Sequence, residues 1–178
     1  MSEEQRGFWG EVWHRLRKWA VGWARGGPHF VIGYPGRPYL LRWYVLPRNP
    51  VLNVYLHKFV RDDDDRALHD HPWPSLSVLL KGWYIEVTEE ERFGRRVEVH
   101  SPYFAGAVRL RSATFRHRIM LPHGRPAWTL FFTGPVLREW GFWCRSEGGT
   151  ERFVPHQEFT KPGNPGEVGA GCGEGAGA

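Results

Sequence analysis

Two histidines stand at the head of an apolar, strand-like run in residues 66–87, RALHDHPWPSLSVLLKGWYIEV. Alternate residues of a β-strand project to the same face, so His69 and His71 point together while Asp70 points away from them. Imidazole nitrogens are good ligands for transition metals, and two of them on one face make half of a metal site. The stretch therefore predicts a strand that carries part of a metal centre.

A third ligand has to come from another strand, because catalytic metal sites usually combine three protein ligands with positions open to water or substrate. His117 is the best candidate, since it lies well downstream in the strand-like run 112–121. The alternative is that the histidines are surface residues, or hydrogen-bonded core residues, without a metal. We expect a metal site with the ligands His69, His71 and His117.

From about residue 29 onward the chain consists of short runs rich in valine, leucine and aromatic residues, bounded by Pro, Gly, Asp or Asn. The expected strands lie in residues 39–46, 52–60, 75–88, 95–101, 107–121 and 127–134. Such spacing is typical of an all-β sandwich or barrel. Residues 81–82 and 93–94 are expected to form hairpin turns, and residues 62–65 a solvated acidic turn.

The two ends of the chain differ from this central part. Residues 7–25 place four tryptophans on one arc at 3.6 residues per turn, with basic residues opposite. We expect an amphipathic helix that packs on the barrel or on a second copy of the chain, with a membrane surface as the alternative partner. The C-terminal end is rich in Gly, Ala and Pro, so we expect disorder there. The expected division is a helix in 1–27, a barrel in 28–160 and a tail in 161–178.

Charge and composition argue against several classes of protein. The net charge of +5 comes from residues 1–48, which hold 8 Lys/Arg and 3 Asp/Glu, whereas residues 49–178 hold 16 of each. A neutral barrel lacks the recurrent basic stripe of a nucleic-acid-binding surface. We expect neither a transmembrane segment nor a secretory signal. Two cysteines cannot make a disulfide framework, so we expect a cytoplasmic, reducing location.

Two motifs resemble those of the cupin superfamily, namely G-x5-H-x-H-x3-4-E-x6-G and G-x5-P-x-G-x2-H-x3-N. The residues that match are His69, His71 and Gly82 in the first motif, and Gly106 and His117 in the second. The resemblance covers about residues 50–135 and implies a single double-stranded β-helix, or jelly-roll barrel. With the N-terminal amphipathic helix, the expected fold is mainly β. The chain also resembles cupin-like proteins of bacteria and their phages that have no assigned activity.

The chain departs from the family pattern where the first motif has its glutamate, since Ser75 or Leu76 stands there. Further departures are Asp63 in place of Gly, and Ser112, Thr114 and Leu121 in place of Pro, Gly and Asn. A three-histidine site without the glutamate resembles the thiol dioxygenase branch, in which ferrous iron binds substrate and oxygen. The resemblance implies one divalent transition metal, Fe(II), with Zn, Ni and Mn as alternatives, and an oxidoreductase acting on a small polar molecule.

Several further residues are candidates for the site. Glu86 and Tyr84 share one strand face and would be acid–base or hydrogen-bonding groups near the metal. The candidates for binding an anionic substrate are His57 and the four arginines Arg109, Arg111, Arg116 and Arg118, because guanidinium groups pair with carboxylate or phosphate. The alternative for the arginines is the polar outer face of an antiparallel sheet.

Two rival functions stay open from the sequence. One is a metal-free cupin that isomerises or epimerises a sugar nucleotide, with a histidine as base and a tyrosine as its partner. The other is a non-catalytic binding module, in which the barrel is a scaffold and the tryptophan-rich helix an interface. A homodimer would form through a barrel edge or through the N-terminal helix.

Overall fold

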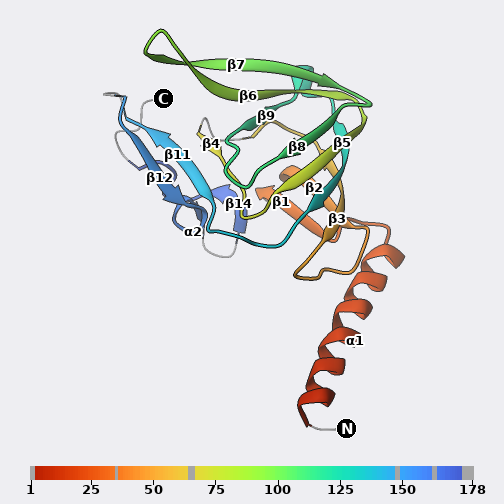
Figure 1. The fold of residues 1–178 in the computed structure, drawn as a ribbon. Helices are drawn as coiled ribbons and strands as arrows, with labels where there is room; N and C mark the ends of the chain where they lie inside the picture. Colours follow the sequence, from red (N-terminus) through yellow and green to blue (C-terminus); the bar gives the residue numbers. More distant parts are fainter. Residues whose placement is uncertain (1–2, 35, 64–66, 147–148, 162–163, 174–178) are drawn as a thin grey trace.

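A long N-terminal helix is followed by a succession of short strands in the computed structural model, which describes residues 3–34, 36–63, 67–146, 149–161 and 164–173 (Figure 1). The elements in chain order are α1 (Glu3–Ala24), β1 (Phe30–Tyr34), β2 (Arg37–Tyr44), β3 (Asn53–Phe59), β4 (Leu68–His69), β5 (Ser75–Lys81), β6 (Trp83–Arg92), β7 (Arg95–Phe104), β8 (Val108–Arg111), β9 (Arg118–Met120), η1 (Pro122–Gly124), β10 (Ala127–Thr133), β11 (Gly141–Arg145), β12 (Glu151–Pro155), α2 (His156–Phe159), β13 (Thr160–Lys161) and β14 (Asn164–Val168). Every run expected to be a strand contains one. The predicted fold class, mainly β with an N-terminal helix, is confirmed.

The strands β1 to β12 form two layers, and β13 and β14 form a separate two-stranded sheet. One layer is an antiparallel sheet in the order β1-β2-β3-β10-β5-β8. The other consists of the sheets β7-β6-β9 and β12-β11-β4, which an isolated antiparallel bridge between His69 and His117 joins at their facing edges. Because β10 pairs with both β3 and β5, segments far apart in the sequence become neighbours. The bridge also places two candidate metal ligands, His69 and His117, where these two smaller sheets meet.

The turns expected at residues 81–82 and 93–94 are confirmed. Gly82 connects β5 to β6 with φ +82°, and a Cβ atom there would lie 2.6 Å from the carbonyl oxygen of Pro126. Only glycine fits this backbone conformation and this close approach. Phe93 and Gly94 both have positive φ at the tip of the β6–β7 hairpin, as a two-residue primed turn requires.

Two clusters of buried side chains hold the layers together. The first lies between β5, β6, β9 and β10 and consists of Leu79, Tyr84, Ile119, Leu121 and Ala127. The second lies around β11 and β12 and consists of Phe142, Cys144, Val154 and Phe159, with Val168 and Cys172 packed against it. The C-terminal segment thus contributes to the second cluster.

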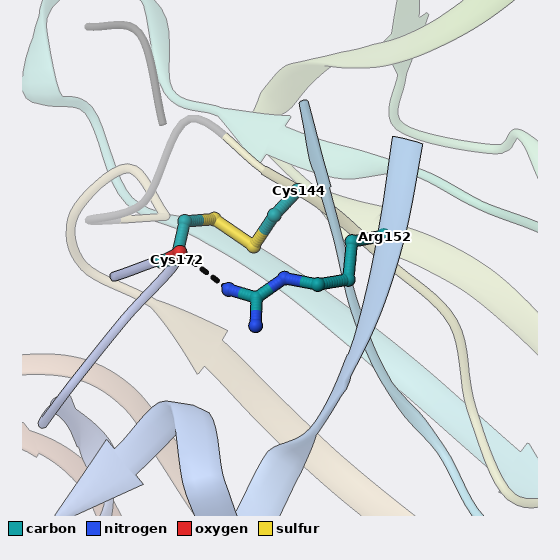
Figure 2. The surroundings of a disulfide bond; sticks show 3 residues. All are labelled: Cys144, Arg152 and Cys172. Atoms are coloured by element: carbon teal, nitrogen blue, oxygen red, sulfur yellow. Dashed lines mark hydrogen bonds between the residues drawn. A yellow bond between two sulfur atoms is a disulfide. The ribbon is translucent and has the colours of Figure 1, made fainter. Parts of the chain in front are cut away.

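The C-terminal segment differs from the expected disordered tail. β13 pairs with β14, and Cys172 forms a disulfide with Cys144 across a Cα–Cα distance of 5.5 Å. Figure 2 shows the Arg152 guanidinium donating to the carbonyl oxygen of Cys172, at 2.7 Å. A covalent bond and backbone pairing hold this segment, although it has few apolar side chains of its own. Residues 162–163 and 174–178 of the expected tail lie outside the described residues.

The disulfide also bears on the expected location. Disulfides persist in oxidising compartments and are rare in the cytosol. The cysteines therefore give no support to the reducing location that the sequence predicted.

The helix α1 projects away from the strands (Figure 1). It ends at Ala24, two residues before Gly26, where the sequence predicted an end. The indole N–H groups of Trp19 and Trp23 both donate to the carbonyl oxygen of Tyr44, whereas Trp13 is 69% exposed. Both of these hydrogen bonds come from the last turns of the helix. Among the described residues, no helix has the length and hydropathy needed to cross a membrane.

Candidate metal centre

A backbone bridge places His69 and His117 side by side. His69 ends β4 and His117 precedes β9, and the N–H of each donates to the carbonyl oxygen of the other at 3.0 Å. Directly opposed residues of an antiparallel pair have their side chains on the same face. His71 follows two residues after His69 on that face, where its N–H donates to the carbonyl oxygen of Ala113. The expected grouping of three histidines is therefore present.

The three imidazoles have the spacing of ligands to one ion. One ring nitrogen from each of His69, His71 and His117 lies within 4.8 Å of the others, and the Nε2 atoms of His71 and His117 are 3.0 Å apart. Two nitrogens bound to one metal at 2.0–2.1 Å are separated by about 3 Å. The Nδ1 atom of His69 is buried without a hydrogen-bond partner in the described part of the chain. A neutral nitrogen donor set of this kind suits a first-row transition metal.

Glu86 lies behind His117, on the side away from the cluster. It is 1% exposed, and its Oε1 accepts hydrogen bonds from His117 Nδ1–H at 2.6 Å and from Arg111 Nε–H at 2.7 Å. The proton of His117 is thereby held on Nδ1, which leaves the Nε2 lone pair toward the cluster. Carboxylates in this position orient histidine ligands in metal sites.

Burial favours the neutral form of two histidines of the cluster, His71 and His117. It lowers the pKa of His71 well below the usual value, and the neighbouring His69, His117 and Arg111 lower it further. Burial also lowers the pKa of His117, with His69 and Arg111 adding to the effect. Neutral imidazole is the form that binds metals, so these two side chains are ready to act as ligands at neutral pH.

The cluster faces a cavity of about 420 Å³ between the two layers of strands. This volume is within the range of sites for small organic molecules. Most of the lining side chains are apolar or aromatic, including Phe59, Trp73, Phe131, Trp140 and Phe142. The wall is completed by Phe159 of α2, Thr160 of β13 and Val168 of β14.

The other predicted site residues separate into two groups. Tyr84, His57 and Arg111 line the cavity. Burial raises the pKa of Tyr84, whose hydroxyl lies 3.4 Å from Arg111 Nη2. The remaining arginines pair with carboxylates: Arg109 reaches Glu86 at 3.7 Å, Arg116 reaches Glu151 at 2.8 Å and Arg118 reaches Glu98 at 2.9 Å. The arginine cluster of the sequence is not one cluster in the fold.

Asp70 points away from the histidines, as strand alternation predicts. It is 1% exposed and accepts hydrogen bonds from Arg138 at 2.6 Å, from the Trp143 indole at 3.1 Å and from the Gly141 N–H at 3.0 Å. These bonds join the strand of His69 to β11. Asp70 therefore helps to hold the ligand-bearing segment in place.

The expected solvated turn at 62–65 also supports the site. The Asp63 carboxylate accepts the N–H of Ile119 at 2.8 Å, and the Asp62 carboxylate accepts the N–H of Leu121. These bonds tie the loop to β9, directly after His117. The other residues of this loop, 64–65, lie outside the described residues.

Two arginines that the sequence analysis did not select also line the cavity, Arg42 and Arg48. Arg42 lies on β2, two residues after the buried Leu40. The signal that could have identified Arg42 is its position in an apolar strand, on the same face as the buried Leu40. This signal is not sufficient by itself, because the sequence does not show which face of β2 points into the barrel.

No protein-family model matches the sequence, and no curated protein matches it. Among solved structures, the chain is similar to a cupin superfamily protein from Desulfitobacterium hafniense DCB-2, with 14% identity and a TM-score of 0.41 over 56% of this chain and 78% of that one. It is also similar to an uncharacterised conserved protein with a double-stranded β-helix domain from Klebsiella pneumoniae subsp. pneumoniae MGH 78578, with 15% identity and a TM-score of 0.43 over 62% and 89%.

A third similar structure is that of hydroxypropylphosphonic acid epoxidase from S. wedmorenis, with 15% identity and a TM-score of 0.42. The match covers 59% of this chain and 54% of the epoxidase. The first two of these similar structures are named as cupin or double-stranded β-helix proteins, the type of barrel that the histidine motifs implied.

Proposed function

We propose that this chain binds one divalent transition metal, Fe(II), through His69, His71 and His117, and uses it to oxidise a small organic molecule. The observation that supports the proposal is a cluster of three imidazoles, one buried and two partly buried, that faces a cavity and has no carboxylate among its proposed ligands. When bound, such a metal would supply redox chemistry with molecular oxygen and leave positions open for a substrate.

The side chains around the cluster have supporting roles in this proposal. Glu86 orients His117 through its hydrogen bond to Nδ1 and is itself held by Arg111. Tyr84 keeps its phenolic proton, since burial raises its pKa, and can donate a hydrogen bond into the cavity. The aromatic lining excludes water, which strengthens polar interactions with a bound molecule.

Metal content tests the ligand assignment. Protein purified without added metal, then loaded with Fe(II), is expected to hold about one ion per chain by elemental analysis. His117→Ala should abolish binding, whereas His100→Ala should retain it, because His100 lies on the surface and pairs with Glu98. Glu86→Gln should weaken binding about 10- to 100-fold through loss of ligand orientation. Equal metal content in the His117 and His100 variants would refute the assignment.

Nitric oxide tests whether the metal has an open position. The Fe(II)-loaded protein is expected to give an electron paramagnetic resonance signal of an iron nitrosyl, because three protein ligands leave room for further ones. An iron-loaded sample without this signal would point to a structural metal in a binding module. An isomerase activity that persists in chelator would support the metal-free alternative.

A further inference from the structure

Arg42 lines the cavity and has no acidic partner among the described residues. Its Nε–H donates to His57 Nε2 at 2.8 Å, and its guanidinium lies 4.7 Å from the ring centre of Tyr55. Burial lowers its pKa, and the charged or titratable groups around it include His57, three tyrosines and a second arginine, Arg48. No carboxylate of the described residues lies within ion-pair distance of Arg42.

The contrast with Arg111 shows what Arg42 lacks. Arg111 also lines the cavity, but Glu86 neutralises its charge at 2.7 Å. Charges withdrawn from water are normally paired or hydrogen-bonded. Arg48, on the exposed side of the lining, adds a second positive charge near Arg42. This end of the cavity is therefore electropositive, whereas the histidine end has the carboxylate of Asp63 in its lining, 4.0 Å from His69 Nδ1.

We propose that Arg42 binds the carboxylate of an organic acid whose apolar, ring-sized body fills the cavity toward the histidine cluster. As the substrate class of the metal site, this inference rests on the proposed function. The Nε–H of Arg42 is committed to His57, so the Nη edge remains for the anion. Two parallel N–H groups on a planar guanidinium match the two oxygens of a carboxylate.

Aromatic side chains connect the Arg42 end with the histidine end. The Phe131 ring lies 5.0 Å from His57 and 6.5 Å from His71, between centroids. Trp73 lies 5.6 Å from Phe131 and stacks on His71 at 4.8 Å. A molecule whose carboxylate sits on Arg42 therefore runs along apolar surfaces to the metal ligands. The apolar part of such a molecule gains binding free energy when its surface is buried against this wall. An inorganic anion has no apolar surface to bury and does not gain this free energy.

His57 is a positioning residue in this arrangement. Burial, with Arg42 and His71 adding to it, lowers the pKa of His57. The ring is therefore neutral, and its Nε2 is free to accept the Nε–H of Arg42. This bond sets the plane of the guanidinium.

The test uses the full chain in its metal-free form, so that a carboxylate cannot bind to the metal instead. Isothermal titration calorimetry would compare phenylacetate, its neutral isostere phenylacetamide and inorganic phosphate. Phenylacetate is expected to bind tightest. Arg42→Met should weaken it about 10- to 100-fold, as loss of a charge-assisted pair does, and Arg42→Lys less. The matched control is Arg95→Met, which removes an exposed charge far from the lining and should leave binding unchanged.

Three outcomes would overturn the inference: unchanged phenylacetate binding in Arg42→Met, equal binding of phenylacetamide, or phosphate as the tightest ligand. If Arg42→Met does not fold, the Arg42 Nε–H resonance of the wild-type protein gives the answer, because phenylacetate should shift it and phenylacetamide should not. A protein that binds metal but not phenylacetate refutes this inference alone. A protein that binds phenylacetate but no metal refutes the proposed function alone.

Discussion

The two ends of the chain differ in how firmly they are attached to the barrel, and the difference is the reverse of what their apolar content predicts. The N-terminal helix carries four tryptophans, yet Trp13 is 69% and Trp23 42% exposed. The C-terminal segment is rich in glycine, yet it pairs as β13–β14, is bonded to Cys144 and packs Val168 on a core cluster. An apolar segment has surface that can be buried, but burial also requires another part of the fold close enough to pack against it.

The difference extends to the candidate site. Phe159, Thr160 and Val168 line the cavity, whereas no described residue of α1 does. Residues of α2, β13 and β14 thus form part of the wall of the site. Of the tryptophans of the helix, Trp13 is left 69% exposed, and both the barrel and a second copy of the chain were predicted as partners of this face.

The largest expected effect comes from the disulfide of the C-terminal segment. Replacing Cys144 and Cys172 together by Ser should lower the free energy of unfolding by about 3–4 kcal/mol, because the bond closes a loop of 28 residues. Urea denaturation measures this. Dithiothreitol should destabilise the wild-type protein similarly and leave the double variant unchanged. Identical curves for both proteins would mean that strand pairing alone holds the segment.

Deletion of residues 1–24 should have a smaller effect, about 1–2 kcal/mol, since it removes the two indole hydrogen bonds to Tyr44 and little core packing. The truncated protein should stay folded and retain its metal. Size-exclusion chromatography with light scattering should show self-association in the full chain and not in the truncated one. Aggregation or metal loss after truncation would show that the helix is part of the fold.

The smallest expected effect on stability comes from single substitutions of two tryptophans of the helix, Trp19 and Trp13. Trp19→Phe should cost about 1 kcal/mol, because it removes the indole N–H that donates to Tyr44 at 2.8 Å. Trp13→Phe should change the free energy of unfolding by less than about 0.5 kcal/mol, because Trp13 is mostly exposed. Thermal and urea unfolding measure both. Equal costs would contradict an attachment through the last turns.

The elements and part of the site could be predicted because their signals are local. Strand alternation placed His69 and His71 on one face, and the turn at Gly82 followed from glycine's freedom in φ. The C-terminal segment could not be predicted, since its order depends on a disulfide between residues 28 positions apart. Such a contact leaves no periodic pattern in the sequence.

By itself the sequence determined the helix, the strands and the candidate ligands, because side-chain periodicity and turn residues act within a few positions of the chain. The tertiary structure decided which arginines matter. Arg111 is neutralised by Glu86 and Arg116 by Glu151, whereas Arg42 faces the cavity without an acidic partner among the described residues. Charge pairing depends on strands brought together from distant parts of the chain, and strand order is set by packing of the whole barrel.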